Sequence, residues 1–588
     1  MNRQLLAIAL VLLASTPMSA QQGKALAHAT TATPVSAEML DQDDVVTRAM
    51  RDEMQRSMKD LRLDSTDGPY YIAYKIVDRD RKEAEASLGA LVSSEEARSR
   101  VLTVTVHVGS YDLDNTNFNA GGRGGGGGDS LSAAAGVLPI DDTYDELRRK
   151  IWLATDAAYK RAVEDLSAKK AAQQTSNRED AIPDFSKQPP RQESEVLPPI
   201  ALGLPAAEHL VRAASAVFRT LPSIQSSDAA LEIENATEHF LNSEGAAYTR
   251  QVPAIFFHAS ASLQHQTGEI FTDSYSAYGH TFSDLPSEAA LLQNTGAVVQ
   301  RLSARLQGTL ATHYIGPVLV EGESSAELFA HNFANQLAAR GRPGAGGLGG
   351  RAGGGGNGRG FGGNAGGPGG ANPGLLNKIG SRVFPDFLTV VDNPQLTQLD
   401  GHPLFGSYKF DEESVPSRET LIVKDGILKT LLTSRAPARG IPESTGNMRE
   451  RGVLPGNLIV TASKSASRDD LKKQLLDLVK ARSLDYGMIV RRLSGDNATE
   501  AVRLYPDGHE ETVRDSRLEE FAVSSFKDVL AVSTERTVYT ENAQGIFNFG
   551  GDFISYAVPD MLFEELTLEH IPNDTPKLPD IPSPLASN

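Results

Sequence analysis

The chain is 588 residues long, which is more than one hydrophobic core usually serves, so we expect two or more domains. Its formal net charge of −18 at pH 7 is an acidic balance that disfavours nucleic acid as a partner. Cysteine is absent, which excludes disulfides, thiolate metal ligands and a thiol nucleophile.

The first residues have the pattern of a secretory signal peptide. Arg3 precedes an apolar run from Leu5 to Ala14, and a polar segment that ends in small residues follows. The apolar run is shorter than the roughly 20 residues that a membrane-spanning helix needs, and no later run is long enough. We therefore predict that residues 1–20 are a cleaved signal peptide, that the protein is periplasmic or secreted, and that it has no stable membrane anchor.

Residues 40–315 alternate between helical and strand patterns, which predicts an N-terminal α/β domain with a mixed sheet. Helices are predicted over 44–63, 144–170, 206–219 and 286–310; strands are predicted from Pro69, over 84–92 and 100–109, and as an antiparallel run over 229–283 with turns at 242–245 and 266–268. Residues 121–135 are expected to form a Gly-rich disordered loop, and residues 173–199 an extended segment on the surface.

Residues 316–575 have a β-rich pattern, which predicts a second domain and an α+β fold for the whole chain. Strands are predicted around residues 382–394 and 406–411, in a hairpin that turns at Asp425–Gly426, in another that turns at Asp507–Gly508, and at 560–572; residues 469–480 are predicted to be helical. A second Gly-rich disordered loop is expected over 341–374, and a disordered tail over 576–588.

The segment from Gly316 to Arg340 has the pattern of a strand, a turn and a helix. Ser324 has the spacing of an N-cap with Glu327 three residues later, as in a capping box. The helical residues Ala326, Phe329, Ala330, Phe333 and Leu337 form one apolar stripe. His331 lies on a different side of the predicted helix, so it is not a residue of the core stripe.

A metal-hydrolase helix would follow this histidine with a general-base glutamate and, about a turn later, a second histidine. Asn332 follows His331 instead, and Gln336 is five residues after it. We therefore predict no catalytic residue and no complete metal site, and keep Glu327 and His331 as weak candidates for contact with one cation. The competing interpretation is that His331 is hydrogen-bonded in a semi-buried interface.

Two other polar stretches contain candidate residues. Asn447, Arg449 and Arg451 are candidates for binding a peptide carboxylate or backbone, with a turn bearing solvated arginines as the alternative. The adjacent acids Glu412 and Glu413 are expected on the solvated surface, as such pairs usually are.

Four stretches of the chain resemble the TldD/PmbA family, which is related to metalloproteases: YDELRRKIWLATDAAYKRA, HYIGPVLVEGESSAELFAHNFA, FGSYKFDEESVPSRETLIVKDGILKTLLTSR leading into STGNMR, and VPDMLFEELTL. The resemblance implies an N-terminal α/β domain, a β-rich C-terminal domain and assembly with a paired homologue around a chamber. In the metal-bearing member, an HExxxH motif follows the GPVL-like strand and a cysteine near the C-terminus completes the site.

Carried over to this chain, the resemblance leaves a degenerate motif. His331 matches the first histidine, Asn332 stands where the glutamate should be, Gln336 stands where the second histidine should be, and the cysteine has no counterpart. The other member of the pair also lacks the motif and is the better match.

The sequence thus predicts an exported, noncatalytic subunit of a peptidase complex that binds unfolded peptides, without zinc or another cofactor. Its expected partner is a homologue that retains HExxxH. The alternatives are an active metallopeptidase with a rearranged site around Glu327 and His331, and an independent peptide-binding or scaffold protein of the envelope.

Overall fold

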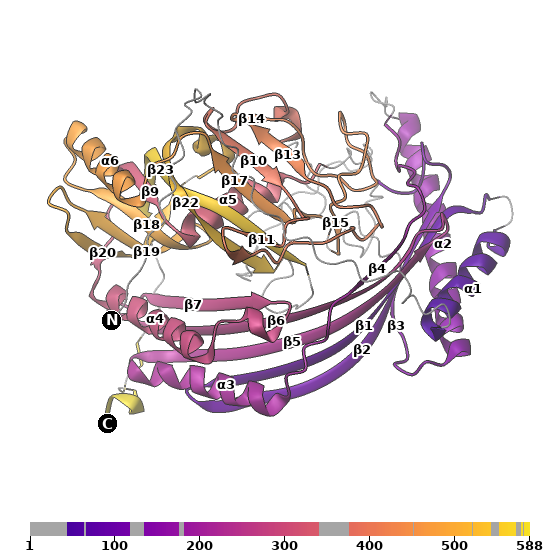
Figure 1. The fold of residues 1–588 in the computed structure, drawn as a ribbon, viewed down its shortest axis with the longest axis horizontal. Coiled ribbons are helices and arrows are strands. Elements are labelled where there is room, and N and C mark those ends of the chain that lie inside the picture. Colours follow the sequence, from indigo (N-terminus) through magenta and orange to yellow (C-terminus); the bar gives the residue numbers. More distant parts are fainter. Residues whose placement is uncertain are drawn as a thin grey trace, which may run out of the picture. The chain divides into compact units, whose positions relative to one another are not determined.

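The computed structural model describes residues 44–63, 66–117, 134–175, 182–339, 375–450, 452–519, 521–542, 552–571, 578–579, 581 and 583–587. All of them belong to one compact unit that runs from Val35 to Asn588. The fold is α+β, as predicted, and most strands belong to two large sheets (Figure 1). The predicted signal peptide and the two Gly-rich loops lie outside the described residues, except that residues 134 and 135 begin a strand.

The first sheet has the strand order β3-β2-β1-β5-β6-β4, and β7 pairs with the second half of β6. Its strands are β1 Pro69–Ser87, β2 Ala90–Val108, β3 Ala134–Val137, β4 Gln192–Val196, β5 Ile224–Asn242, β6 Ala247–Gln264 and β7 Ile270–Gly279. Neighbouring strands are antiparallel apart from β4, which runs parallel to β6. The sheet is therefore mixed, as expected.

Strands β1 and β2 are much longer than the sequence pattern indicated. The predicted strand over Ala84–Val92 is wrong, because Leu88 and Gly89 form the turn between β1 and β2, both with positive φ. The charged run from Asp78 to Glu83 hid the continuation of β1. Its side chains are stabilised by acids on β5, as in the pair between Arg81 and Glu232, so the strand needs no alternating apolar pattern there.

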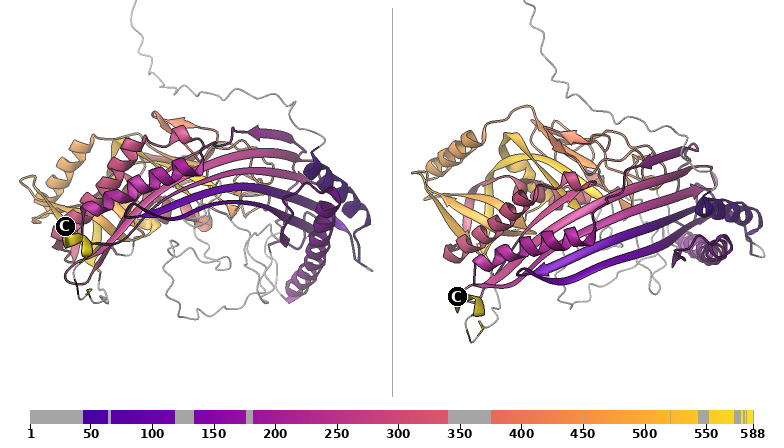
Figure 2. Two further views of the ribbon diagram at one scale, coloured as in Figure 1. Left: turned by 90° about the horizontal axis from the view of Figure 1, so that it is seen from below. Right: turned by 60° about the horizontal axis from the view of Figure 1, so that its bottom comes forward.

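Helices cover this sheet at two places. Helix α3 Leu204–Ala216 lies against β1, β2 and β5, helix α4 Glu288–Gln307 lies against β6 and β7, and the two helices share one apolar core with the sheet (Figure 2). The helices α1 Val45–Asp60 and α2 Tyr144–Thr175 form a second core with β1 and β2. Asp44 caps α1 by accepting hydrogen bonds from the amides of Val46 and Thr47. All four predicted helices of this region are present.

The second sheet has the order β14-β13-β10-β17-β23-β9-β18-β19-β20-β8, with β21 and β22 also paired to β23. Its strands are β8 Thr309–Leu310, β9 Tyr314–Val320, β10 Leu388–Asp392, β13 Thr420–Lys424, β14 Ile427–Leu428, β17 Asn457–Ala462, β18 Gly487–Ser494, β19 Asn497–Leu504, β20 Glu510–Arg514, β21 Ser516–Leu518, β22 Val529–Asn542 and β23 Phe553–His570. Two further hairpins pair β11 Gln398–Leu399 with β12 His402–Pro403, and β15 Met448–Arg449 with β16 Gly452–Val453. The helices of this region are α5 Glu323–Asn332 and α6 Arg468–Ala481.

Both predicted hairpin turns are confirmed. Asp425 and Gly426 have positive φ between β13 and β14, as a two-residue hairpin turn requires, and the turn at Asp507–Gly508 joins β19 to β20. None of the helices in the described ranges combines the length and the apolar content that crossing a bilayer requires.

Three expectations for irregular segments are corrected. Within 173–199, β4 adds a strand to the first sheet, and Phe185 is buried rather than on the surface. Residues 406–411 form no strand, since Phe410 makes only an isolated bridge with Pro416; Gly406 packs so closely on the backbone of Gly456 that a Cβ would collide with it. In the predicted disordered tail, Pro584–Ser587 form a short 3₁₀ helix, and most other residues there lie outside the described ones.

Candidate functional site

The corner between β9 and α5 lies in the middle of the second sheet. Strand β9 pairs antiparallel with β23 on one side and parallel with β18 on the other, and Val318 and Val320 are fully buried. Helix α5 follows directly from the carboxyl end of β9 (Figure 1). The strand-turn-helix prediction for this segment is therefore confirmed, and the segment is anchored on both sides.

The start of α5 differs from the predicted capping box. Gly322 is the N-cap, with φ of 64°, a conformation that a residue with a side chain rarely adopts. Ser324 lies inside the helix, and its hydroxyl donates to the carbonyls of Glu321 at 2.7 Å and Val490 at 2.8 Å. The capping role of Ser324 and Glu327 is therefore wrong, because the glycine turn places the helix start two residues earlier.

The apolar stripe of α5 is confirmed. All five predicted members are fully buried, and Phe329 and Phe333 pack against Phe384 with ring centroids 6.1 and 4.9 Å away. The helix ends at Asn332 and continues as a 3₁₀ turn over Ala334–Gln336, so it is shorter than predicted. Packing of this stripe fixes which way the opposite, polar side of α5 faces.

Amide side chains on the polar side of α5 bond to the helix itself. Asn332 Nδ2 donates to the carbonyl oxygen of Leu328 at 3.1 Å, and Gln336 Nε2 donates to that of Asn332 at 2.9 Å. These are the two positions that the family motif assigns to the general base and the second histidine. Each amide nitrogen is thus occupied by a backbone partner one turn earlier.

Two carboxyl groups lie close to His331. Glu327 Oε2 accepts a hydrogen bond from the amide of Leu493 at 3.2 Å, and burial raises the pKa of Glu327 to about 8 against the opposing charge of Arg492. Glu541, on β22, accepts a hydrogen bond from the Tyr556 hydroxyl at 2.6 Å. Burial also raises the pKa of Glu541, and the tyrosine bond and the charge of His331 oppose that rise.

Sequence reasoning missed Glu541. It comes from a strand far along the chain, and its position in a Thr-Val-Tyr-Thr-Glu stretch resembles any strand end. Only the pairing of β22 with β23 brings it to α5. The described chain therefore holds Glu327, His331 and Glu541 in one half-buried cluster, which we call the α5 cluster.

The α5 cluster does not fit the zinc site of the family motif. Zinc ligands must be deprotonated, whereas a carboxyl with a pKa of about 8 is mostly protonated at neutral pH. In the described part of the chain, no three His, Cys, Asp or Glu side chains come together as a metal site would require.

The predicted peptide-binding residues are held by internal partners. Asn447 Nδ2 donates to Asp392 Oδ2 at 2.7 Å, and Arg449 Nε donates to Asp552 Oδ1 at 3.0 Å. Arg449 also stacks on the ring of Tyr408. Both predicted side chains are buried, so the alternative of a turn with solvated arginines is wrong for Arg449. Arg451 lies outside the described residues.

The acidic pair Glu412–Glu413 was expected on the solvated surface, and this is wrong. Glu412 is 4% exposed and pairs with Lys75 of β1 and Arg250 of β6. Burial alone would raise its pKa, but these two cations hold the pKa of Glu412 well below its usual range. Glu238 completes this group, which we call the Glu412 cluster, by pairing with Arg250 at 2.5 Å and Lys75 at 3.3 Å.

Comparison with known families identifies the C-terminal part of the chain. Residues 372–570 match the model of the PmbA/TldA metallopeptidase C-terminal domain. The match covers most of the second sheet and β22 with Glu541, while α5 precedes it.

Similar proteins share short parts of the sequence. A metalloprotease of Methanocaldococcus jannaschii is 44% identical over 78 residues, which are 13% of this chain and 16% of the relative. A PmbA metalloprotease homologue of Buchnera aphidicola is 32% identical over 122 residues, 21% of this chain and 23% of the relative. The chain thus matches less than a quarter of the length of each of these relatives.

Similarity of fold extends much further. The crystal structure of TldE from Thermococcus kodakarensis superposes with a TM-score of 0.54 over 88% of this chain and 99% of that chain, at 13% sequence identity. At this identity the likeness is one of fold, and it covers both large sheets described above.

Proposed function

The chain belongs to the TldD/PmbA family, and on that premise we propose that it is an exported, noncatalytic subunit of a peptidase complex that binds unfolded peptides. The observation that carries the proposal is the bonding of Asn332 and Gln336 to their own helix. Loss of a positioned general acid or base typically lowers a rate by about 100- to 10,000-fold. With amides at two of the motif positions, helix α5 keeps its place in the fold but lacks the general base and the second histidine of the motif.

The tight packing of helix α5 supports a role as a partner subunit. The apolar stripe of α5 is packed as fully as a core helix, and its turn is held by Asp560, whose carboxylate accepts a hydrogen bond from the amide of Gly322 at 2.7 Å. We infer that a helix packed in this way positions the subunit for assembly with a homologue that retains HExxxH. Its own zinc content is then expected to be negligible.

Peptide binding draws its support from one short strand edge, that of β8, where the Leu310 carbonyl already accepts a hydrogen bond from Arg503 Nη2 at 3.2 Å. Strand β8, at one end of the second sheet's strand order, pairs only with β20 within the described residues, and Thr309 and Leu310 are exposed. An extended peptide can add to such an edge through its backbone, a mode that tolerates many sequences.

A second candidate function is a rearranged metallopeptidase site around Glu327 and His331, to which Glu541 adds a second carboxyl group. In the described part of the chain these three groups do not come together as a metal site requires, so a metal ion would have to draw them closer. The raised pKa of Glu327 opposes metal binding at neutral pH. This candidate therefore predicts activity that appears only as the pH rises through about 8.

Co-expression with a homologue that retains HExxxH tests the proposal. We expect the two chains to purify together from the periplasm, with the signal peptide removed, and the complex to hydrolyse an unfolded protein such as reduced casein. The chain alone should be inactive. Failure to form a stable complex would overturn the subunit role in favour of an independent envelope protein, and hydrolysis by the chain alone would favour the rearranged metallopeptidase.

A further inference from the structure

Strand β2 is the outermost long strand on one side of the first sheet, and only part of its edge is covered (Figure 1). Strand β3 pairs with β2 from Val101 to Val104. From Ser93 to Arg100, β2 pairs with β1 alone among the strands of the described residues. Within this stretch, every residue from Glu95 to Ser99 is exposed. The edge of β2 is therefore open to solvent over most of this stretch.

Backbone groups on this open edge have no partner. The carbonyl oxygen of Arg100 points to the outer side, because it accepts a hydrogen bond of 2.9 Å from the amide of Leu138. Every second residue of a strand presents its backbone to the same side, so the N–H and C=O groups of Ser94, Glu96 and Arg98 also point outward. Within the described ranges, none of these outward groups has a hydrogen-bond partner. An unpaired edge of this kind can pair with another strand.

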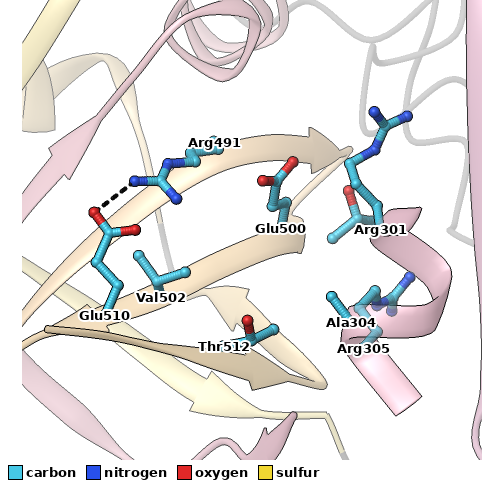
Figure 3. A pocket seen from close by; sticks show the side chains of 9 residues that line it. Arg301, Ala304, Arg305, Arg491, Glu500, Val502, Glu510 and Thr512 are labelled. Carbon is cyan, nitrogen blue, oxygen red and sulfur yellow. Dashed lines mark hydrogen bonds and ion pairs between the residues drawn. The ribbon is translucent and has the colours of Figure 1, made fainter. Parts of the chain in front are cut away.

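Side chains occupy the opposite edge of the same sheet, which β7 forms. The carbonyl oxygen of Thr272 accepts a hydrogen bond from Arg305 Nη1 at 3.2 Å. That of Ser274 accepts hydrogen bonds from Arg301 Nη2 at 3.4 Å and from Arg492 Nη2 at 3.1 Å. Figure 3 shows Arg301 and Arg305 on α4, where both line a cavity beside β19 and β20. The open edge is thus a property of β2 and not of the whole sheet.

Charges alternate from strand to strand along this edge. Lys82 of β1 is opposite Glu96 of β2, and its Nζ lies 3.9 Å from Glu96 Oε1. Asp80 of β1 is opposite Arg98 of β2. Glu96 and Arg98 are two residues apart, so their side chains lie on the same face of the sheet. A further strand continues the alternation if it places a basic residue beside Glu96 and an acidic residue beside Arg98.

We propose that the edge of β2 from Ser93 to Ser99 binds an extended peptide segment with an acidic residue opposite Arg98 and a basic residue opposite Glu96. The segment runs antiparallel to β2, as β3 does on the same edge. The bulge at Val92 and the start of β3 limit it to about seven residues.

The charges on this edge select among strands. Charged edges ordinarily keep other strands away, and a segment with like charges opposite Glu96 and Arg98 is repelled here too. A segment with the complementary order gains two cross-strand charge pairs in addition to the backbone hydrogen bonds. The inference goes beyond the proposed function, because the edge belongs to the first sheet and binding there needs neither a homologue nor hydrolysis.

Fluorescence anisotropy with a labelled, end-blocked peptide of sequence Val-Glu-Val-Lys-Val-Thr-Val tests the proposal. We expect the full chain to bind this peptide with a Kd below about 1 mM. The peptide Val-Lys-Val-Glu-Val-Thr-Val has the same composition but places both charges opposite like charges, so it should bind about fivefold or more weakly. Methylation of the backbone nitrogens of Glu and Lys in the first peptide should abolish binding, because these amides donate to the edge.

Three results with the unmodified protein would overturn the proposal. They are no binding of the first peptide up to about 1 mM, equal affinity for the two charge orders, and full affinity for the N-methylated peptide. The last result would show that the peptide is held by its side chains and does not add to the sheet as a strand.

A charge exchange in the protein locates the site. In the double variant Glu96→Arg with Arg98→Glu, the preference between the two charge orders should reverse, since each peptide then meets the opposite signs. The matched control exchanges an exposed ion pair of α2, as Asp156→Lys with Lys160→Asp, and should keep the wild-type preference. The melting temperature verifies that both variants fold. An unchanged preference in the folded β2 variant would place the peptide elsewhere, such as at β8, and overturn the site.

Discussion

The Glu412 cluster and the α5 cluster are two groups of charged side chains that the fold removes from solvent in opposite ways. In the Glu412 cluster, two carboxylates face two cations, and the pKa of Glu412 is lowered. In the α5 cluster, burial dominates and the pKa values of Glu327 and Glu541 are raised. Balanced charges are what a structural contact needs, whereas uncompensated ones are typical of functional sites or their remnants.

The difference separates charges that hold parts of the fold together from charges that the fold leaves without an opposing partner. The Glu412 cluster joins β1 and β6 of the first sheet to the loop that carries Glu412. Among the described residues, the α5 cluster has no comparable set of ion pairs between elements. The amide side chains of Asn332 and Gln336 beside it bond to their own helix. Changes in the first cluster should therefore affect stability, and changes in the second should affect mainly titration.

Breaking the Glu412 cluster should have the largest effect. Arg250→Ala leaves Glu412 and Glu238 buried with only Lys75 as a cation, so we expect a loss of about 3–5 kcal/mol in the free energy of unfolding. Urea denaturation followed by fluorescence measures it. Lys473→Ala, which removes an exposed pair with Asp470, is the control and should leave the stability essentially unchanged. Equal effects of the two variants would show that the buried cluster is not structural.

Neutralising Glu327 should have an intermediate, pH-dependent effect of opposite sign. The folded-state pKa of about 8 is above the ordinary value of 4.5, so the unfolded chain loses its proton first and stability falls as the pH rises from about 4.5 to 8. The Glu327→Gln variant has no carboxyl group at this position, so this fall in stability with pH is absent from it. Because the side chain is partly exposed, we expect a gain of only about 1–2 kcal/mol at pH 8 and none at pH 4.5.

Thermal denaturation of both proteins across this pH range measures the difference. Glu323→Gln is the matched control, since Glu323 lies on the same helix and pairs with Arg492. A wild-type stability that rises between pH 5 and 8 relative to Glu327→Gln would contradict the raised pKa of this carboxyl.

Removing His331 should change stability little. The imidazole is partly exposed, and its contact with Glu541 is electrostatic, so His331→Ala is expected to alter the free energy of unfolding by about 0.5 kcal/mol or less. Peptide hydrolysis by a complex with the homologue should be unchanged as well. A loss of several kcal/mol on equilibrium denaturation would show that His331 is a structural residue.

Deleting residues 344–370 should have the smallest effect. These residues lie outside the described part of the chain, and the prediction rests on their glycine-rich composition, which cannot supply a core. We expect the melting temperature to stay within a few degrees of the full-length value. A larger decrease would show that the segment packs.

The sequence predicted the elements well where local pattern decides structure. Helices such as α2 and α6 and the turn at Asp425–Gly426 follow from periodicity and turn chemistry. It failed where partners come from distant strands, as for the continuation of β1 through its charged run and for Glu412, whose cations belong to β1 and β6. A pair of adjacent acids gives no sign of partners so far away in the chain.

The candidate site was predicted only in part. The position of His331 opposite an apolar stripe followed from helical spacing, and the structure places it there. Glu541 and the internal bonds of Asn332 and Gln336 depend on the tertiary arrangement and on side-chain geometry. Residues such as Arg449 looked available for binding because the sequence does not show their buried partners.

Metal content and peptide hydrolysis of the purified chain alone decide whether it is a noncatalytic subunit. We expect zinc far below one equivalent per chain and no hydrolysis of an unfolded protein, with wild type and His331→Ala indistinguishable. One equivalent of zinc together with hydrolysis that His331→Ala abolishes would contradict it.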